Sequence, residues 1–428
     1  MLPSSFYDKL KRRTMETYKT VRGMQDLLPE QLLRWHFFEE KARLLLQEYG
    51  YKEIRTPLVE EKTLFERSVG EATDIVEKEM YTFCDRKGRH LALRPEGTAS
   101  VVRAYVQARY YQMRRITRFW YQGPMFRYDR PQRGRYRQFY QLGVEVFGGK
   151  HPLFDVEVIS LLILLLQTAG LSQPLLRVNS LGCIPCQQAY SQLLKNFLHP
   201  YRESLCPDCV RRLERNTLRV FDCKNISCLK ILQRAPSPAK HLCPTCQQHY
   251  QLVLSTLSKM NTKLLVDEHL VRGLDYYTGT VFEVTAGNDP SALAAGGRYD
   301  TLVASFGGPE VPAVGFAIGL ERLMNMISTP VKEQPLLRAF FLGDKARLFG
   351  FSFLAELRKK GIPVEVDFEE RPLKNHLQAA SREKVKWCLF FGENELSEEK
   401  ILLKNMETRE QHTLPLSECF QKIKELIC

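Results

Sequence analysis

The stretch from Arg118 to Phe147 constrains the fold more than any other part of the sequence. Two long runs with strand character flank the polar segment Asp129–Gly134, whose proline and glycine are typical of a connecting loop. The pattern predicts an antiparallel hairpin of two long strands. Because side chains alternate between the two faces of a strand, it also predicts which residues share a face.

The two faces of the second strand differ in character. One face carries Tyr136, Tyr140, Leu142, Val144 and Val146. The other is polar but contains rings, and its members are Arg135, Arg137, Phe139, Gln141, Gly143, Glu145 and Phe147. This second face is typical of a ligand floor, in which Gln141 and Glu145 flank a gap at Gly143 and a carboxylate can hold an ammonium group. Arg127, on the opposing strand, can reach a phosphate or a carboxylate.

Arginines and aromatic rings are dense from Arg103 to Arg137. This stretch holds ten arginines, nine aromatic residues and one acid, Asp129. Guanidinium groups fit phosphates and rings stack on bases, so the composition suits a nucleotide or a nucleic acid. A structural sheet with surface arginines fits the density alone equally well. The formal net charge of +13 adds only a weak preference for polyanionic partners.

The length of the chain predicts more than one domain. At 428 residues it exceeds the size at which one hydrophobic core keeps growing, so a large domain and one or two smaller ones are expected. Pro29–Gly50 has the apolar spacing of an amphipathic helix, with proline in its first turn and glycine at its end. A short strand with Pro57 in its middle is expected at a sheet edge or a subunit contact, because proline lacks a ladder donor.

A second, smaller domain is predicted after a linker at Glu333–Leu336. Strand and helix patterns alternate there, which predicts a small α/β domain. The predicted strands are Phe340–Leu342, Pro363–Phe368 and Trp387–Phe391, and the predicted helices are Lys345–Lys360 and Leu373–Glu383.

Eight of the twelve cysteines lie between Leu171 and Met260, a segment that interrupts the strand-rich region and is predicted to be an inserted module. They form three C-x2-C pairs and a looser fourth pair, namely Cys183 and Cys186, Cys206 and Cys209, Cys243 and Cys246, and Cys223 and Cys228. The spacing favours structural zinc, since four thiolates leave no open position for catalysis. Eight ligands can fill two sites, or four can bind while the others are buried thiols.

Targeting signals are not evident in the sequence. The longest apolar run, Val158–Leu166, is far shorter than the roughly 20 residues that a membrane span needs. Met1–Thr20 has scattered charges and no apolar core before a cleavage site, so no secretory signal is predicted, and Met15 is an alternative start. A cytoplasmic protein without a membrane partner is expected, in which the thiols stay reduced.

Several of these segments together resemble a known family. Gly123–Glu145 closely resembles motif 2 of class II aminoacyl-tRNA synthetases in its histidyl form, and Arg94–Thr98 resembles the amino-acid loop of that family. Gly315–Arg322 is similar to motif 3, and Arg272–Tyr277 resembles a signature peculiar to histidyl enzymes. Ala295–Asp300 follows at the expected position. The resemblance runs from about Val21 to the C-terminus.

The resemblance implies a fold and a domain order. It implies an α+β catalytic domain built on an antiparallel sheet (21–332), with the cysteine-rich helical module (171–260) inserted in it. An N-terminal extension (1–20) precedes this domain, and a C-terminal α/β anticodon-binding domain (337–428) follows it. By family analogy the protein forms a homodimer.

The implied reaction is activation of L-histidine by ATP, giving histidyl-adenylate and pyrophosphate, and then transfer of histidine to the 3′ end of tRNA(His). By resemblance Arg127 grips the α-phosphate, Arg322 holds the distal phosphates, and Arg272 takes the place of a metal beside the α-phosphate. Mg2+ accompanies the pyrophosphate portion. Preplaced cations suit this chemistry because negative charge builds on phosphate oxygens.

The resemblance also assigns residues to histidine and to tRNA. The imidazole nitrogens would be bound by Glu96, Tyr276 and Tyr277, and the α-amino group by Thr98, Gln141 and Glu145. Tyr299 would close the pocket. The loop residues Arg130, Gln132 and Arg133 would contact the acceptor end of the tRNA.

Two alternatives remain from the sequence. One is a paralogue of the synthetase that binds histidine as a regulatory subunit of ATP phosphoribosyltransferase, although such paralogues usually lose the catalytic arginines and the C-terminal domain. The other is a non-catalytic RNA-binding protein with zinc knuckles, which leaves the pair of Gln141 and Glu145 unexplained.

Overall fold

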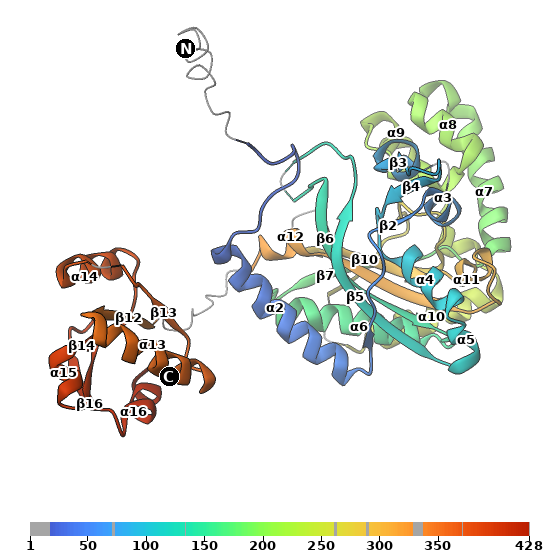
Figure 1. The fold of residues 1–428 in the computed structure, drawn as a ribbon. Helices are drawn as coiled ribbons and strands as arrows, with labels where there is room; N and C mark the ends of the chain where they lie inside the picture. The colour runs from blue at the N-terminus through green and yellow to red at the C-terminus, as the bar shows by residue number, and fades with distance from the viewer. Residues whose placement is uncertain are drawn as a thin grey trace, which may run out of the picture. The chain divides into compact units, whose positions relative to one another are not determined.

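The computed structural model describes residues 18–70, 73–132, 134–260, 263–287, 291–327, 337–369 and 371–427. The chain divides into two compact units, Met1–Thr329 and Pro330–Cys428 (Figure 1). The predicted linker at Glu333–Leu336 and most of the predicted N-terminal extension lie outside the described residues. Within the described part of the chain, no helix is both long and apolar enough to cross a membrane.

The first unit is built on an eight-stranded sheet of order β1-β5-β6-β11-β10-β9-β7-β8. In that order the strands are Lys52–Glu53, Thr117–Phe126, Gln138–Phe147, Ala313–Gly319, Ala292–Arg298, Thr278–Ala286, Pro174–Ser180 and Lys263–Val266. The six central strands pair antiparallel, as predicted. The edge strands β1 and β8 pair parallel with their neighbours, so the sheet as a whole is mixed.

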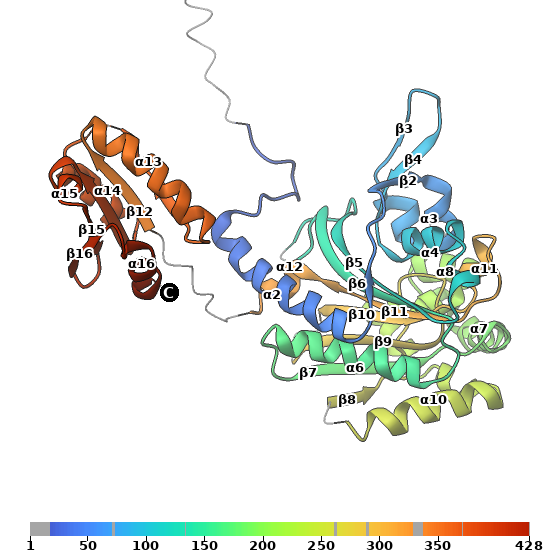
Figure 2. The same ribbon diagram turned by 60° about the horizontal axis from the view of Figure 1, so that its bottom comes forward.

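Helices cover one face of this sheet. Here α2 (Pro29–Glu48) and α6 (Leu153–Thr168) lie side by side, and α10 (Pro244–Leu257) packs against α6 (Figures 1 and 2). Apolar residues on the face of β6 that these helices cover, such as Leu142 and Val144, pack with the helices in one hydrophobic core. The helix α6 is buried on most sides, which explains its nearly continuous apolar sequence.

The opposite face carries α4 (Thr98–Gln107), whose Val101 and Tyr105 pack with Phe119 and Phe147 of the hairpin. The short helices α5 (Tyr110–Met113) and α11 (Leu302–Ser305) contact α4, whereas α12 (Leu320–Met324) packs its Leu320 and Leu323 into the core with α2 and α6. The functional side chains described below project from the face of the sheet that carries α4.

The expected helix at Pro29–Gly50 is confirmed, but the strand through Pro57 is wrong. Pro57 lies between β1 and β2 (Val59–Glu61), and β2 belongs to a second sheet of order β2-β4-β3 with β4 (His90–Leu93) and β3 (Thr82–Cys84). Because proline lacks a backbone donor, it is placed where the chain leaves one sheet and enters the other. The chain continues through α3 (Lys62–Val69) and the π-helix η1 (Ile75–Glu79).

The cysteine-rich segment begins with β7 of the large sheet and then becomes helical. Its elements before α10 are α7 (Ile184–Leu198), η2 (His199–Ser204), α8 (Pro207–Arg215), η3 (Thr217–Asp222), α9 (Ile226–Leu232) and η4 (Pro238–His241). Cys183, Cys206 and Cys243 are the N-cap residues of α7, α8 and α10, each with proline at the first or second helical position. A C-x2-C pair therefore places both thiols at the start of one helix.

The second unit has a five-stranded sheet of order β13-β12-β14-β15-β16. Its elements are β12 (Leu337–Leu342), α13 (Asp344–Lys359), β13 (Val364–Val366), α14 (Leu373–Arg382), β14 (Trp387–Gly392), α15 (Glu393–Ser397), β15 (Lys400–Asn405), β16 (Gln411–Pro415) and α16 (Cys419–Ile427). The three predicted strands pair parallel, and the two predicted helices are present. The antiparallel hairpin β15–β16 was not predicted.

Candidate active site

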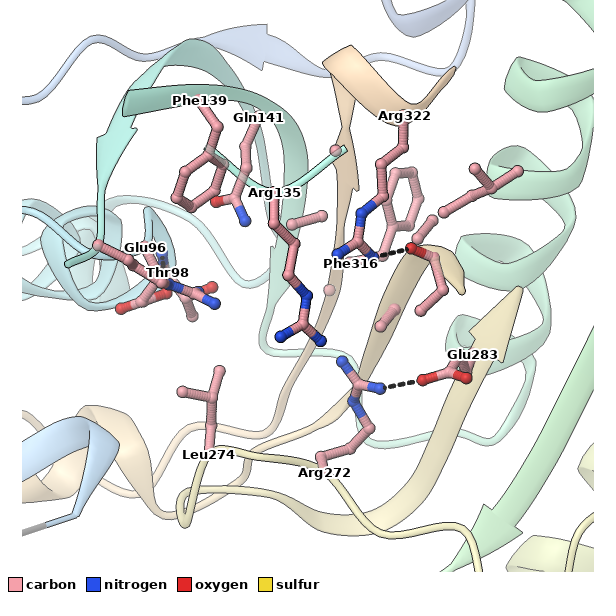
Figure 3. Close-up of a pocket in the computed structure, with 18 of the residues that line it drawn as sticks. Glu96, Thr98, Arg135, Phe139, Gln141, Arg272, Leu274, Glu283, Phe316 and Arg322 are labelled. Carbon is pink, nitrogen blue, oxygen red and sulfur yellow. Dashed lines mark hydrogen bonds and ion pairs between the residues drawn. The ribbon is translucent and has the colours of Figure 1, made fainter. Parts of the chain in front are cut away.

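A cavity of about 380 Å³ lies in the first unit, lined by the hairpin, β10, β11 and the loops around them (Figure 3). All ten residues to which the resemblance gave a role toward histidine or ATP line it, namely Glu96, Thr98, Arg127, Gln141, Glu145, Arg272, Tyr276, Tyr277, Tyr299 and Arg322. These residues come from segments far apart in the sequence, and the fold brings them together in one place.

Glu145 is the most deeply placed charged group in the cavity. Its side chain is 1% exposed. The Thr98 hydroxyl donates to its Oε1 at 2.7 Å, and the Tyr299 hydroxyl donates to its Oε2. Burial raises the pKa of Glu145 to about 8 despite these two hydrogen bonds. The two hydrogen bonds therefore hold the carboxyl group in position, and no cationic side chain among the described residues pairs with it.

The predicted gap at Gly143 is not open to a ligand. The ring of Tyr121 fills it, because a Cβ atom built on Gly143 would lie 2.3 Å from Tyr121 Cζ, and one on Gly97 would lie 2.2 Å from Tyr121 Cε2. Gly315 on the adjacent strand likewise leaves room for the carboxyl group of Glu145, because a Cβ atom there would lie 2.0 Å from Glu145 Oε2. Alternation along one strand could not show which ring from β5 enters the gap.

The predicted alternation along β6 is confirmed only within the strand itself. Phe139, Gln141 and Glu145 line the cavity, whereas Leu142 and its neighbours face the helices. Before the strand begins at Gln138 the prediction is right for Arg135, which lines the cavity, but wrong for the next two residues. Tyr136, assigned to the opposite face, lines the cavity, and Arg137 turns away and stacks on Tyr128, with its Cζ 3.7 Å from the ring centroid. Period two does not apply to loop residues.

Gln141 and Glu96 present different hydrogen-bonding states. The Oε1 atom of Gln141 is buried and has no hydrogen-bond partner among the described residues. Both oxygens of Glu96 accept backbone N–H groups at the start of α4, from Thr98 at 2.7 Å and from Ala99 at 2.8 Å. Glu96 thus stabilises the helix start as well as lining the cavity.

Three tyrosines form an aromatic wall. The ring centroids of Tyr276 and Tyr277 are 4.6 Å apart, and those of Tyr276 and Tyr299 are 5.6 Å apart. Burial raises the pKa of Tyr276 and of Tyr277, so both phenols stay protonated at neutral pH and can donate hydrogen bonds.

Arginines supply positive charge on the wall of the cavity. Figure 3 shows Arg135, Arg272 and Arg322 extending into the same space, on the side away from Glu96 and Thr98. Arg272 pairs with Glu283 at 2.7 Å, and the Nε of Arg322 donates to the Gly134 carbonyl at 2.9 Å. These contacts fix the positions of the guanidinium groups.

Arg127 is fixed in a similar way. Its Nε donates to the Pro95 carbonyl at 2.8 Å, and its Cζ lies 5.3 Å from the centroid of the Phe139 ring. The backbone of the amino-acid loop and the floor of the hairpin thus hold this arginine from two sides.

Several lining residues were given no role from the sequence, namely Glu79, Asp129, Arg135, Glu283 and Glu321. Glu321 precedes Arg322 and accepts the Tyr140 N–H with both oxygens, at 2.9 and 3.0 Å. Glu283 is the partner of Arg272. Nothing in the sequence indicated that Glu283, which lies on β9, would line the cavity.

Two of the three residues predicted to contact tRNA are described by the structure. Arg130 and Gln132 are in the loop between β5 and β6 and do not line it, and Gln132 forms a β-bridge with Arg135. Arg133 lies outside the described residues.

The eight cysteines of the helical module form two groups of four. Group 1 is Cys183, Cys186, Cys243 and Cys246, and group 2 is Cys206, Cys209, Cys223 and Cys228. Within each group the sulfur atoms all lie within 4.8 Å of one another. Two sulfur–sulfur distances, 3.5 Å for Cys183–Cys186 and 3.7 Å for Cys206–Cys223, match the roughly 3.8 Å expected between thiolates around tetrahedral zinc. The donor set therefore fits this metal.

Comparison with known proteins places this geometry in a family. The family model described as histidyl-tRNA synthetase matches residues 23–196 and 209–323, and the one described as anticodon binding domain matches residues 342–426. The chain belongs to the histidyl-tRNA synthetase family. It is 44% identical over 414 residues to a protein of Desulfatibacillum aliphaticivorans named histidine–tRNA ligase, covering 96% of this chain and 99% of that protein.

Solved structures agree with membership in the histidyl-tRNA synthetase family. The apo histidyl-tRNA synthetase of S. aureus is similar with a TM-score of 0.80 and 34% identity, covering 95% of this chain and 100% of that one. A Bacillus halodurans structure described as an ATP phosphoribosyltransferase regulatory subunit/histidyl-tRNA synthetase has a TM-score of 0.63 and 22% identity, covering 88% and 97%. This second likeness shows a shared fold only.

The raised pKa of Glu145 predicts a pH dependence of stability. Between roughly pH 4.3, the usual value for a free glutamate, and about pH 8, the folded protein holds a proton that the unfolded chain has released. The free energy of unfolding therefore falls as pH rises through this range, by up to about 1.4 kcal/mol per pH unit.

Denaturant unfolding at about pH 5 and about pH 8 measures this loss. We expect a smaller loss in Glu145→Gln, which cannot titrate at this position. Glu321, whose pKa burial raises to about 7, contributes equally to both proteins. An equal loss in the wild type and the variant would contradict the buried, protonated state of Glu145.

Proposed function

We propose that this chain activates L-histidine with ATP and transfers it to the 3′ end of tRNA(His). The observation that carries the proposal is a cavity in which the buried carboxyl group of Glu145, which pairs with no cationic side chain in the described part of the chain, faces a set of anchored arginines. The first can bind an amino acid through its ammonium group, and the second can bind the phosphates of ATP.

In the histidine subsite, the ammonium group is proposed to bind Glu145, Thr98 and Gln141. Glu145 supplies the negative charge, and Gln141 supplies a buried acceptor without a partner among the described residues. The imidazole ring is proposed to contact Glu96, Tyr276 and Tyr277, and Tyr299 closes the site while its hydroxyl holds Glu145. Polar groups for both imidazole nitrogens allow discrimination against apolar amino acids of similar size.

In the ATP subsite, Arg127 and Arg272 are proposed to stabilise the charge that develops on the α-phosphate, and Arg322 to hold the distal phosphates. Because these side chains are already anchored to Pro95, Glu283 and Gly134, little reorganisation is needed during the reaction. Mg2+ would neutralise part of the pyrophosphate charge when it enters with ATP, and Glu283 is a carboxylate on the wall with the oxygen ligands that this ion prefers.

The tRNA is proposed to contact two regions. Arg130, Gln132 and Arg133 in the hairpin loop would bind the acceptor end, and the C-terminal unit would bind the anticodon. A homodimer and a cytoplasmic location are further proposals that rest on the family.

The two alternatives fit the site less well. A regulatory paralogue needs only the histidine subsite, whereas this chain keeps Arg127, Arg272 and Arg322 in one cavity of the first unit. It also has a C-terminal unit that matches an anticodon binding domain. A zinc-knuckle RNA-binding protein needs no buried carboxylate beside a phosphate-binding set of arginines.

ATP–pyrophosphate exchange with each of the twenty amino acids tests the proposal. We expect exchange with histidine, and a loss of roughly 100-fold or more in kcat for Arg127→Ala, because a preplaced cation would be missing in the transition state. Arg118→Ala is the matched control, since this arginine of β5 pairs with Glu157 away from the cavity. Absence of histidine-dependent exchange in the wild type rejects the proposal.

We also propose that each group of four cysteines binds one structural zinc ion. The module then contains two closed tetrathiolate sites, which leave no coordination position for a substrate. Mass-spectrometric metal analysis is expected to give two zinc ions per chain for the wild type and one for Cys209→Ser, which removes a ligand of group 2 only. Less than one zinc per wild-type chain after gentle purification would overturn this assignment.

A further inference from the structure

The segment Arg272–Tyr277 carries candidate histidine-binding and ATP-binding residues, yet it contains no helix or strand. Its position therefore depends on contacts that its backbone makes with other parts of the chain. Two of these contacts come from side chains of the cysteine-rich module. Arg219 Nη2 donates to the Gly273 carbonyl at 2.6 Å, and Gln187 Nε2 donates to the Tyr277 carbonyl at 3.0 Å.

Each of these two side chains belongs to an element that a cysteine group fixes. Gln187 directly follows Cys186, a member of group 1, in the first turns of α7. Arg219 lies in η3, the short helix between Cys209 and Cys223 of group 2. A change in either group would therefore move a donor that holds one end of the segment.

Arg219 does more than donate one hydrogen bond. Its side chain is 8% exposed, and its Nε lies 3.6 Å from Asp222 and 3.7 Å from Asp275, which is part of the segment itself. A buried guanidinium group between two acids is costly to remove, because the acids are then left without their counter-charge. The arginine thus fixes the segment by charge as well as through its backbone.

Both donors, Gln187 and Arg219, line a second cavity of about 360 Å³. Its wall includes Gln187 and Arg219 from the module and Arg272, Asp275 and Tyr277 from the segment. The cysteine-rich module and the segment Arg272–Tyr277 are therefore not closely packed against each other here. The segment depends correspondingly more on the few polar contacts that span the space.

We propose that Gln187 and Arg219 are positioning residues through which the two cysteine groups set the geometry of Arg272–Tyr277, so that metal occupancy of the module controls the affinity for histidine. This inference rests on the proposed function. It differs from a purely structural role for the metal, which would change stability and leave the affinity of the folded protein for histidine unchanged.

Binding of histidine measured by titration calorimetry tests the inference. We expect the Kd to rise about tenfold in Gln187→Ala, which loses one hydrogen bond, and further in Arg219→Ala, which loses a charge as well. Arg219→Lys retains the charge and is expected to recover part of the loss. The zinc content of the three variants should equal that of the wild type.

Matched controls are available in the same module. Gln192 of α7 bonds to Asn196 on the helix surface, and Arg202 of η2 pairs with the exposed Glu214. Gln192→Ala and Arg202→Ala are expected to bind histidine as the wild type does. A wild-type Kd in both Gln187→Ala and Arg219→Ala would overturn the inference.

Hydrogen exchange separates this inference from the proposed function. Amide exchange within 272–277 is expected to accelerate in Arg219→Ala, and also in the wild type after partial removal of zinc by a chelator, whether or not histidine is the substrate. If exchange within 272–277 is unchanged both in Arg219→Ala and after zinc removal, the proposed coupling between the cysteine groups and the segment is rejected. If exchange accelerates after zinc removal but the wild type binds no histidine, only the proposed function is rejected. Because Gln187→Ala removes no charge, it serves if Arg219→Ala fails to fold.

Discussion

The hydrogen-bonded, buried carboxylate of Glu145 connects most of the elements that form the cavity. An ionised carboxylate is costly to bury, and the cost is reduced only where donors meet it. Thr98 at the start of α4 and Tyr299 after β10 supply these donors. Gly315 of β11 has no side chain, which leaves the space in which Oε2 of Glu145 lies. Three segments of the sequence must therefore come together around one strand for this residue to be tolerated.

Positive charge is arranged in a complementary way. Arg127, Arg272 and Arg322 each contact a carbonyl or a carboxylate of a different segment, so their guanidinium groups are placed before any ligand arrives. The backbone that carries Arg272 is itself held by Gln187 and Arg219. The cysteine-rich module thus contributes to the rigidity of the site although none of its cysteines lines the cavity. Preorganisation of this kind is the main source of electrostatic catalysis.

The sequence predicted those features that depend on local periodicity. The hairpin, the faces of β6, the helix at Pro29 and the alternating elements of the C-terminal unit all follow from spacing. Prediction from spacing failed where a side chain from another strand fills a space that the pattern leaves open, as the Tyr121 ring does at Gly143. The spacing also could not show how eight cysteines divide into two groups, because the two pairs of group 1, Cys183–Cys186 and Cys243–Cys246, flank group 2 in the sequence and meet only after the helices pack. Family resemblance named ten lining residues, but partners such as Glu283 required the structure.

The central claim is that the carboxylate of Glu145 forms an ion pair with the ammonium group of bound histidine. Burial holds its pKa at about 8, so at about pH 7 the free protein carries a proton there that a bound ammonium group would displace. Titration calorimetry in buffers of different ionisation enthalpy counts that proton. The account predicts that wild-type protein releases about one proton more per bound histidine than Glu145→Gln, whose binding is also weaker. Equal proton release with equal affinity in the two proteins would contradict it.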